Sequence, residues 1–223
     1  MTRVKICGLT TPADARAAAL AGADMVGFVF APSRRRVDPD TAARAAAALP
    51  LFLWRVGVFV DADYDTLVRT AAQVPLDVLQ LHGSEDNALC ARLRRAGYRV
   101  VKAVRVKDAT SLAGITDLEA DAVLLDAAVG TSPGGTGQTF DWRLAAEARE
   151  LLQASRRALP LILAGGLRPD NVQDALRTVR PDGVDVSSGV EAAPGRKSPD
   201  RMREFVMKVR RFDVDPRNGL QGT

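Results

Sequence analysis

The sequence predicts a single-domain α/β protein, a closed (β/α)8 barrel of the TIM-barrel type. Short β-branched or leucine-rich runs alternate with longer segments rich in Ala, Leu and Arg, from the first residues to about residue 211. This alternation is typical of a parallel sheet. Eight repeats of it in 223 residues are more than an open doubly wound sheet usually holds, and the length lies near the lower limit for a closed barrel.

The expected strands are the short apolar runs at residues 4–7, 25–30, 54–60, 78–81, 100–104, 122–126, 161–164 and 184–187. Helical patterns follow them at residues 12–20, 39–49, 64–73, 85–95, 109–117, 142–155, 169–179 and 199–211, of which 109–117 is the weakest. Thr11 and Pro12 supply an N-cap and a first-turn proline for the first helix. The barrel domain is therefore expected over residues 1–211, and the polar residues 212–223 are expected to form a disordered tail.

The composition is that of a globular protein, with 47% hydrophobic and 26% charged residues. It excludes collagen-like and fully disordered chains. The two cysteines cannot build a disulfide framework, and the sequence contains no apolar stretch typical of a membrane span or a signal peptide. We therefore expect a cytoplasmic protein without a membrane partner.

The charge balance is slightly basic, with 31 Lys and Arg against 27 Asp and Glu, a formal net charge of +4. The basic residues are dispersed in pairs, and aromatic residues make up only 5% of the chain. Nucleic-acid-binding domains usually combine clustered basic residues with aromatic ones. A small anionic ligand therefore explains the charge better than a nucleic acid.

The active site of such a barrel lies at the carboxyl ends of its strands. Glycine and serine residues gather after the last two of these: Gly165 and Gly166 follow strand 161–164, and Ser187, Ser188 and Gly189 end or follow strand 184–187. Such residues can simply form tight turns. Because both groups occur where these barrels commonly hold a phosphate, we predict a phosphate-binding site there.

Two residues at strand ends are candidates for acid–base chemistry. Cys7 ends the first strand and is either a small buried residue or a reactive thiol, whereas Cys90 lies in a helical pattern and is expected to pack. Asp126 ends the run AVLLD before a glycine-rich segment. It is either a proton donor or a carboxylate that orders the loop.

Three consecutive arginines, 34–36, follow the second expected strand. One of them could bind a carboxylate with its two-pronged guanidinium, while the others are expected to be solvated. His82, the single histidine, has no partner at a spacing typical of metal ligands. We expect it to be a hydrogen-bonded residue at the rim of the site, and we expect no metal.

Eight segments of the chain together resemble one known family, phosphoribosylanthranilate isomerase of tryptophan biosynthesis. The resemblance covers residues 3–210. The segments are VKICGLT (4–10), GADMVGFVF (22–30), VGVFVD (56–61), LQLHG (79–83), LLD (124–126), GGTGQTFDW (134–142), LAGGLRPDNV (163–172) and DVSSGVE (185–191).

The resemblance implies a barrel enzyme without a cofactor that acts on a small phosphorylated substrate. It would convert N-(5-phosphoribosyl)anthranilate into 1-(2-carboxyphenylamino)-1-deoxyribulose 5-phosphate by an Amadori rearrangement. It implies that Cys7 is the general base and Asp126 the general acid. Arg35 matches the family's arginine for the anthranilate carboxylate, but Arg36 is adjacent, so the assignment stays open between them.

The remaining expectations follow from that reaction. We assign His82, Gly135 and Asp185 to the substrate-binding residues, and we expect a monomer or a homodimer. A free cysteine is mostly a thiol at pH 7. We therefore expect Lys5, on the same strand face as Cys7, to lower the pKa of the Cys7 thiol, in a polar cluster with Asp185.

Two alternatives differ from this interpretation in their sequence features. The histidine-pathway isomerase and the bifunctional barrels carry an aspartate base on the first strand and a two-fold internal repeat, whereas this chain has Cys7 and no visible repeat. A nucleic-acid-binding domain would need the clustered basic and aromatic residues that the chain does not have.

Overall fold

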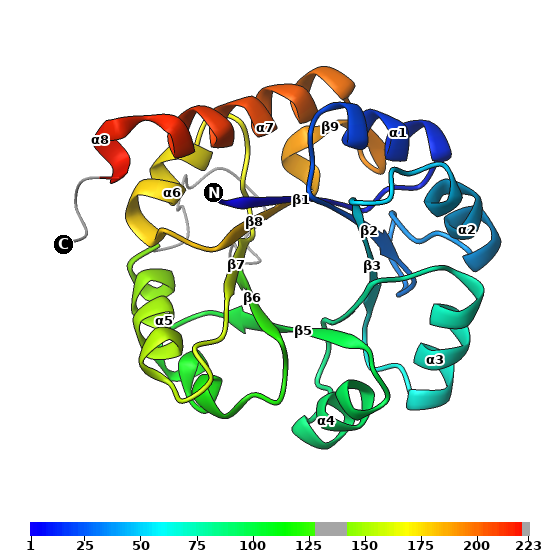
Figure 1. Cartoon of the computed structure of the whole chain (residues 1–223), viewed down its shortest axis with the longest axis horizontal. Helices are drawn as coiled ribbons and strands as arrows, with labels where there is room; N and C mark the ends of the chain where they lie inside the picture. The colour runs from blue at the N-terminus through cyan, green and yellow to red at the C-terminus, as the bar shows by residue number, and fades with distance from the viewer. Residues whose placement is uncertain (128–141, 220–223) are drawn as a thin grey trace.

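The computed structural model describes residues 1–127 and 142–219 and shows eight parallel strands closed into a barrel (Figure 1). The strands are β1 (Arg3–Cys7), β2 (Met25–Val29), β3 (Trp54–Phe59), β4 (Val78–Leu81), β5 (Arg99–Val106), β6 (Ala122–Ala127), β7 (Leu161–Ala164) and β8 (Gly183–Val186). Each strand pairs with the next in sequence, and β8 pairs with β1 to complete the circle. The predicted fold class is confirmed.

Helices surround the barrel on its outside (Figure 1). They are α1 (Pro12–Leu20), α2 (Pro39–Ala47), α3 (Tyr64–Gln73), α4 (Asn87–Arg95), α5 (Trp142–Ala154), α6 (Val172–Val179), α7 (Pro199–Val214) and α8 (Pro216–Gly219). Several begin at a side chain that accepts a hydrogen bond from the first turn, as Thr11 does for α1 and Ser198 for α7. These caps explain why the sequence located the helix starts closely.

Two segments differ from the expectation. Residues 109–117 form two 3-10 turns, η1 (Ala109–Leu112) and η2 (Ile115–Asp117), because Gly114 between them has a left-handed backbone with φ 73°. At the other end, α7 continues to Val214 where a tail was expected from residue 212. The Asp213 carboxylate accepts hydrogen bonds from the backbone N–H and the hydroxyl of Thr2, which ties this helix to the amino terminus.

The strands separate two apolar regions. Val4 and Ile6 of β1 face outward and pack with the helices, while Lys5 and Cys7 face the barrel interior, as the alternation of β1 predicts. The interior also holds a compact apolar cluster from eight other strand positions, namely Met25, Val56, Val78, Val101, Ala103, Leu124, Ile162 and Ala164. The barrel is thus a packed core, whose polar residues are concentrated toward one end.

A short hairpin between β8 and α7 was not predicted. It follows the 3-10 turn η3 (Ser188–Val190) and consists of β9 (Glu191–Ala193) and β10 (Arg196–Lys197), joined by a turn in which Gly195 has φ 79°. A Cβ atom on Gly195 would come within 3.0 Å of the Arg34 carbonyl oxygen. The hairpin therefore packs directly against the loop that follows β2.

Four aspartates brace the amino-terminal ends of the strands in the same way. Each directly precedes an even-numbered strand, donates its backbone N–H to a carbonyl in the preceding strand, and accepts from the N–H of that same residue, at 2.8–2.9 Å. The pairs are Asp24 with Val4, Asp77 with Arg55, Asp121 with Val100, and Asp182 with Leu161. The fold therefore contains a four-fold structural repeat.

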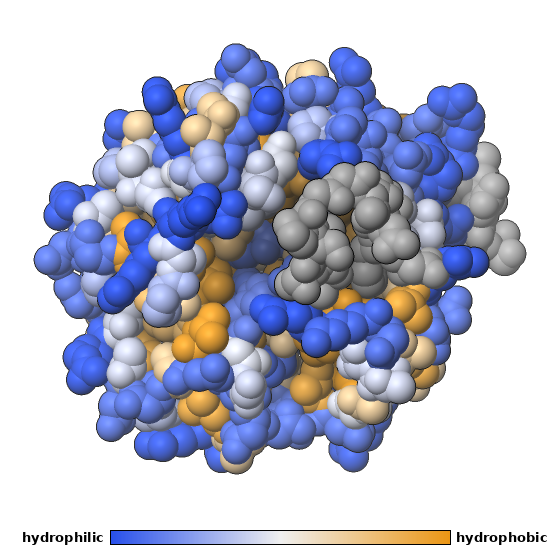
Figure 2. All heavy atoms as spheres, turned by 180° about the vertical axis from the view of Figure 1, so that it is seen from behind, coloured by the Kyte–Doolittle hydropathy of each residue, from blue (hydrophilic) through white to orange (hydrophobic). Residues whose placement is uncertain are grey.

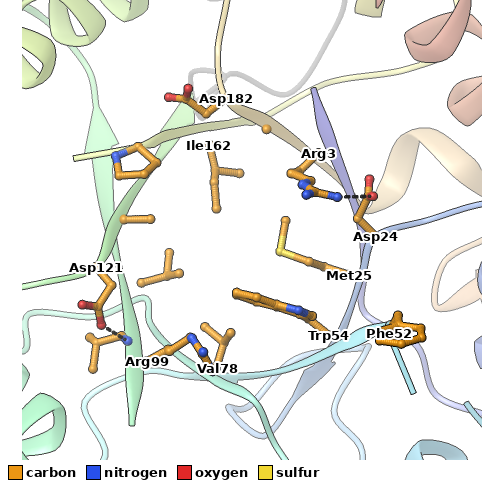
Figure 3. A pocket seen from close by; sticks show the side chains of 15 residues that line it. Arg3, Asp24, Met25, Phe52, Trp54, Val78, Arg99, Asp121, Ile162 and Asp182 are labelled. Atoms are coloured by element: carbon orange, nitrogen blue, oxygen red, sulfur yellow. Dashed lines mark hydrogen bonds and ion pairs between the residues drawn. The ribbon is translucent and has the colours of Figure 1, made fainter. Parts of the chain in front are cut away.

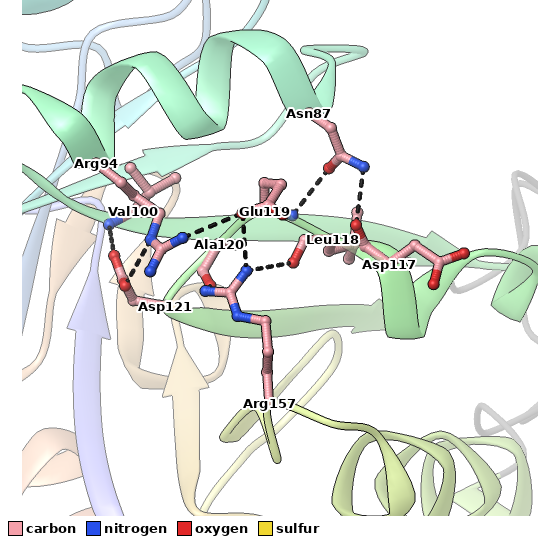
Figure 4. A network of polar contacts seen from close by, with 9 residues as sticks. All are labelled: Asn87, Arg94, Val100, Asp117, Leu118, Glu119, Ala120, Asp121 and Arg157. Atoms are coloured by element: carbon pink, nitrogen blue, oxygen red, sulfur yellow. Dashed lines mark hydrogen bonds and ion pairs between the residues drawn. The ribbon is translucent and has the colours of Figure 1, made fainter.

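At Asp121 this brace is extended by arginines (Figure 4). Arg94 of α4 donates to the carboxylates of Asp121 and Glu119, and Arg157 donates to Glu119 and to the carbonyls of Leu118 and Ala120. Two guanidinium groups thus hold the segment before β6 against the helical layer.

We expect Asp182→Ala to lower the free energy of unfolding by about 1–3 kcal/mol, because it leaves the buried N–H of Leu161 without its acceptor. Urea denaturation measures this change. The matched control is Asp174→Ala, since Asp174 is an exposed carboxylate on α6 that pairs only with Arg177 at the surface. Equal losses of stability in the two variants would contradict the role of the aspartate brace.

Candidate active site

The residues that the sequence selected lie at the carboxyl-terminal end of the barrel, the end shown in Figure 2. This face is hollowed near its centre and its rim carries many hydrophilic residues (Figure 2). Cys7 ends β1, Asp126 is the next-to-last residue of β6, and His82 follows β4. Gly135 lies outside the described residues.

Cys7 is buried at the barrel mouth, with 7% of its surface exposed. Gly27 on the neighbouring strand β2 makes room for it, because a Cβ atom there would lie 2.7 Å from Cys7 Sγ and 3.2 Å from Lys5 Cε. Cys7 and Lys5 therefore share one confined space beside Gly27. Cys90, by contrast, packs in an apolar cluster between α4 and the strands, as expected.

Lys5 is buried to 1% exposure and pairs with Asp185 of β8, its Nζ lying 2.9 Å from Asp185 Oδ2. Burial alone would lower the pKa of the lysine, but the charges of Asp185 and Cys7 outweigh it and raise that pKa. The lysine is therefore an ammonium ion at neutral pH. The expected cluster of Lys5, Cys7 and Asp185 is present.

The pKa of the Cys7 thiol is raised above its ordinary value. Burial is the largest cause, and Asp185 adds to it, whereas Lys5 and Lys197 act in the opposite direction. Lys5 thus lowers the pKa of the Cys7 thiol, as expected, but burial raises that pKa by more. The unliganded protein holds Cys7 as a thiol at neutral pH, with two ammonium groups placed to stabilise the thiolate.

Asp126 lies in a hydrogen-bonded row with His82 and Gln80. Gln80 Nε2 lies 2.8 Å from His82 Nδ1, and His82 Nε2 lies 3.1 Å from Asp126 Oδ2. Because an amide nitrogen can only donate, His82 Nδ1 accepts, and the proton of the neutral ring sits on Nε2 and points at Asp126. The side chain of Asp126 remains 30% exposed, so a ligand in the mouth can reach it.

The two candidate arginines occupy different places. Arg36 is exposed, whereas the Arg35 side chain lies across Gly8, where a Cβ atom would come within 2.5 Å of Arg35 Cδ. The Arg35 guanidinium binds both carboxylate oxygens of Glu191, with Nε 2.6 Å from Oε1 and Nη2 3.0 Å from Oε2. Arg35 is therefore the arginine directed over the end of β1.

Sequence reasoning missed Glu191 and Lys197 of the β9–β10 hairpin. The Lys197 side chain is fully buried, and its Nζ lies 3.1 Å from Glu191 Oε1 and 2.9 Å from the Ser187 carbonyl oxygen. Ser187 Oγ in turn donates to the Cys7 carbonyl oxygen at 3.2 Å. The available signal was a Pro-Gly turn between residues of opposite charge in the segment EAAPGRK, which is typical of a short hairpin.

The expected phosphate-binding loops lie against each other. Gly165 and Gly166, after β7, have left-handed backbones with φ 85° and 65°. Gly189 packs so closely on the same loop that a Cβ atom would collide with the carbonyl oxygen of Leu167. Ser188 and Gly166 are exposed at this contact, so both loops face solvent at the mouth of the barrel.

A cavity of about 630 Å³ lies at the opposite, amino-terminal end of the barrel. It has an apolar floor that includes Met25 and Ile162, and charged residues such as Arg3 and Asp182 at its rim (Figure 3). Trp54 points into it, and Phe52 lies at its side (Figure 3). None of the predicted catalytic residues lines this cavity, so it belongs to a different surface from the candidate active site.

Within residues 1–127 and 142–219, no group of three or more His, Cys, Asp or Glu side chains is arranged to hold a metal ion. In the same part of the chain, every helix is too short or too polar to cross a membrane.

Comparisons of the sequence and of the structure with known proteins find the same family. A sequence model of the N-(5'-phosphoribosyl)anthranilate (PRA) isomerase family matches residues 4–208. The N-(5'-phosphoribosyl)anthranilate isomerase of Paracoccus denitrificans is 50% identical, over 92% of this chain and 96% of its own.

Two solved structures are also similar to this chain over nearly their whole length. One contains monomers of the dimeric phosphoribosylanthranilate isomerase from Thermotoga maritima, with 40% identity, a TM-score of 0.82, and coverage of 94% of this chain and 99% of that one. The other is a phosphoribosylanthranilate isomerase in complex with reduced 1-(o-carboxyphenylamino)-1-deoxyribulose 5-phosphate, with 39% identity, a TM-score of 0.81 and the same coverage.

We expect the Cys7 thiol to ionise above the ordinary range of a free cysteine, and Lys5→Met to raise its pKa further, because the variant removes the nearest stabilising charge and leaves Asp185 unpaired. The pH dependence of alkylation by iodoacetamide measures this pKa, in a Cys90→Ser background so that one thiol reports.

Lys208→Met on α7 is the matched control, since Lys208 pairs with Glu204 on the surface. An unchanged Cys7 pKa in the Lys5 variant would contradict the electrostatic role of Lys5.

Proposed function

Because the chain belongs to the N-(5'-phosphoribosyl)anthranilate isomerase family, we propose that it performs the Amadori rearrangement of this substrate with Cys7 as general base and Asp126 as general acid. The product is 1-(2-carboxyphenylamino)-1-deoxyribulose 5-phosphate, an intermediate of tryptophan biosynthesis. One observation supports these roles most directly: a thiol ending β1 and a partly exposed carboxylate of β6 stand at the same mouth of one barrel.

The first step opens the ribose ring and needs a proton on the ring oxygen as the bond from that oxygen to C1 breaks. Asp126 gives this proton, so its carboxyl group is protonated when substrate is bound. The His82 Nε2–H is directed at Asp126 Oδ2, which leaves Oδ1 as the oxygen that carries and transfers the proton. The step yields a protonated Schiff base between C1 and the anthranilate nitrogen.

The second step moves protons at carbon. The Schiff base makes the C2 hydrogen acidic, and the Cys7 thiolate removes it to give an enolamine. The enolamine gains a proton at C1 and loses the proton of the C2 hydroxyl, which produces the ketose. A thiol whose pKa is raised by burial gives a low fraction of thiolate, but that thiolate is a stronger base. Lys5 and Lys197 stabilise it in the charged form.

The substrate carries an anion at each end, and the mouth of the barrel offers a site for each. The loops of Gly165, Gly166, Ser187, Ser188 and Gly189 receive the phosphate through their backbone N–H groups. Arg35, whose side chain lies over Gly8 beside Ser187, receives the anthranilate carboxylate, and Arg36 stays in solvent. Two fixed ends hold the reacting carbons between Cys7 and Asp126.

Asp185 offers a further contact to the substrate, between its two anionic ends. Its Oδ2 pairs with Lys5, and its Oδ1 is buried with no hydrogen-bond partner among the residues that the structure describes. Such an oxygen is costly unless a ligand or water satisfies it. We assign it to a substrate hydroxyl near C2, which keeps Asp185 among the substrate-binding residues.

The reaction transfers protons within one molecule, so side chains can supply all of its chemistry and we propose that no cofactor takes part. We also propose a cytoplasmic enzyme that binds no nucleic acid. Cys7 and Cys90 are both free and buried, as expected of a protein in a reducing compartment.

Replacement of either catalytic residue should slow turnover strongly while the protein remains folded. We expect Cys7→Ser and Asp126→Asn each to lower kcat/KM for freshly generated phosphoribosylanthranilate by about 10²- to 10⁴-fold. The fall of anthranilate-type fluorescence measures the rate.

Cys90→Ser is the matched control for the thiol and should keep activity near that of the wild type. Full activity in both catalytic variants would refute the assigned roles. Turnover of the aminoaldose substrate of the histidine pathway in place of phosphoribosylanthranilate would favour the alternative isomerase.

Of the two expected oligomeric states, monomer and homodimer, the surface favours the homodimer. Phe52, which lines the cavity at the amino-terminal end of the barrel (Figure 3), is 89% exposed, and its neighbour in sequence, Leu51, is also highly exposed. Adjacent exposed apolar side chains of this size mark interaction surfaces. A protrusion beside a cavity can also fit a two-fold interface, in which the protruding side chains of each copy enter the cavity of the other. The Thermotoga maritima relative is dimeric.

We expect sedimentation equilibrium to give twice the 23.8 kDa of the chain, and Phe52→Asp to give a monomer because a charge cannot enter an apolar contact. Val60→Asp, at an exposed apolar position directly after β3 and so at the opposite end of the barrel, should leave the dimer intact. A monomeric wild-type protein would contradict the interface.

A further inference from the structure

Glu191 lies at the centre of a buried set of charges beside the candidate active site. Its side chain is 6% exposed and contacts two cations, Arg35 from the loop after β2 and Lys197 from β10. Burial would raise the pKa of the carboxyl group, but the hydrogen bond with Arg35 and the charge of Lys197 lower it to about 2. Glu191 is therefore ionised throughout the working range of pH.

The contact with Arg35 occupies one side of the guanidinium. Glu191 takes the Nε–H and one N–H of Nη2. Since a guanidinium has five N–H groups in one plane, the hydrogens of Nη1 and the second hydrogen of Nη2 remain along another edge. That edge matches a second carboxylate in the two-pronged geometry that arginine prefers.

Glu191 itself is held firmly, so it can act as a fixed support. Arg201 of α7 donates to its carbonyl oxygen, and Lys197 holds its Oε1 while also bonding Ser187. Thr10 donates to the carbonyl oxygen of Gly195 and fastens the hairpin to the loop after β1. The position of the Arg35 guanidinium is therefore set from the hairpin.

The charges of the three residues also decide which anion fits. Arg35 and Lys197 carry two positive charges and Glu191 one negative charge, so the group presents a net single positive charge. A single carboxylate balances this charge. Without Glu191 the same place would carry two positive charges and would attract a phosphate dianion as well. An ionised Glu191 thus disfavours binding of the substrate in the reverse direction.

We propose that Glu191 is a specificity-determining positioning residue: it holds Arg35 by one edge so that the other edge receives the aromatic carboxylate of the substrate. The proposal rests on the function proposed above. Glu191 touches no reacting atom, and its effect passes through Arg35. The β9–β10 hairpin, which the barrel itself does not require, has its purpose in this support.

The test compares two inhibitors that differ only in the carboxylate. One is reduced 1-(o-carboxyphenylamino)-1-deoxyribulose 5-phosphate, and the other is the same molecule with hydrogen in place of the carboxyl group. Calorimetric titration gives the ratio of their Kd values. We expect the wild type to prefer the carboxylated compound on the order of tenfold or more, as the loss of a charge-assisted contact implies.

Glu191→Gln should lower this preference at least fivefold, by weakening binding of the carboxylated compound and leaving Kd for the other within about twofold. Glu204→Gln, the same substitution at an exposed ion pair on α7, should keep the wild-type ratio. Glu191→Asp retains the charge beside Lys197 but withdraws the carboxylate from Arg35. It should lower the preference in the same direction, and it decides the matter if Glu191→Gln does not fold.

A wild-type ratio in folded Glu191→Gln or Glu191→Asp overturns the proposal. Arg35→Met separates this result from failure of the proposed function. If the wild type shows a preference that Arg35→Met retains, the carboxylate does not bind Arg35, and the assignment of the substrate's ends is wrong. If Arg35→Met removes the preference and the Glu191 variants keep it, only the role of Glu191 fails.

Discussion

The ion pair between Lys5 and Asp185 is the contact on which the active end of this barrel depends. The two residues are register partners on β1 and β8, the strands whose pairing closes the barrel. A buried ammonium group is tolerated only beside an opposite charge, so Lys5 requires both the closed seam and Asp185. The positive charge of Lys5 in turn stabilises the thiolate of Cys7, the next residue on the same face of β1. The Lys5–Asp185 pair therefore contributes both to closure of the sheet and to the electrostatic environment of the Cys7 thiol.

The two ends of the barrel divide stability and chemistry between them. At the amino-terminal end, four aspartates saturate backbone groups of the neighbouring strands, and the contacts serve the fold alone. The other end holds buried charges such as Lys197, and buried polar atoms such as Asp185 Oδ1 that have no hydrogen-bond partner among the described residues. These groups lower the stability that the same positions could give with apolar residues, and they lie where the proposed function places the substrate.

The sequence predicted the strands and most helices because their periodicity and caps are local. Helices α1 and α3 have the expected bounds, and each begins at a capping residue, Thr11 or Asp63, that the chain places directly before it. It placed Cys7, Asp126, His82 and Arg35 at one end through the rule that links strand ends to the site. It could not separate Arg35 from Arg36, because the choice depends on Glu191, 156 residues away. It also missed the β9–β10 hairpin, whose strands of three and two residues are too short to show an alternating pattern.

The aspartate braces also bear on the order in which the chain folds. Each links residues only 20–22 positions apart, so the loop that it closes is short and inexpensive in chain entropy. The Lys5–Asp185 pair joins residues 180 positions apart and can form only when the ends of the sheet meet. We therefore expect quarter-barrels to form early and the seam to form late. The environment of Cys7 would then come into existence with the last event of folding, so that a partly folded chain carries no reactive site.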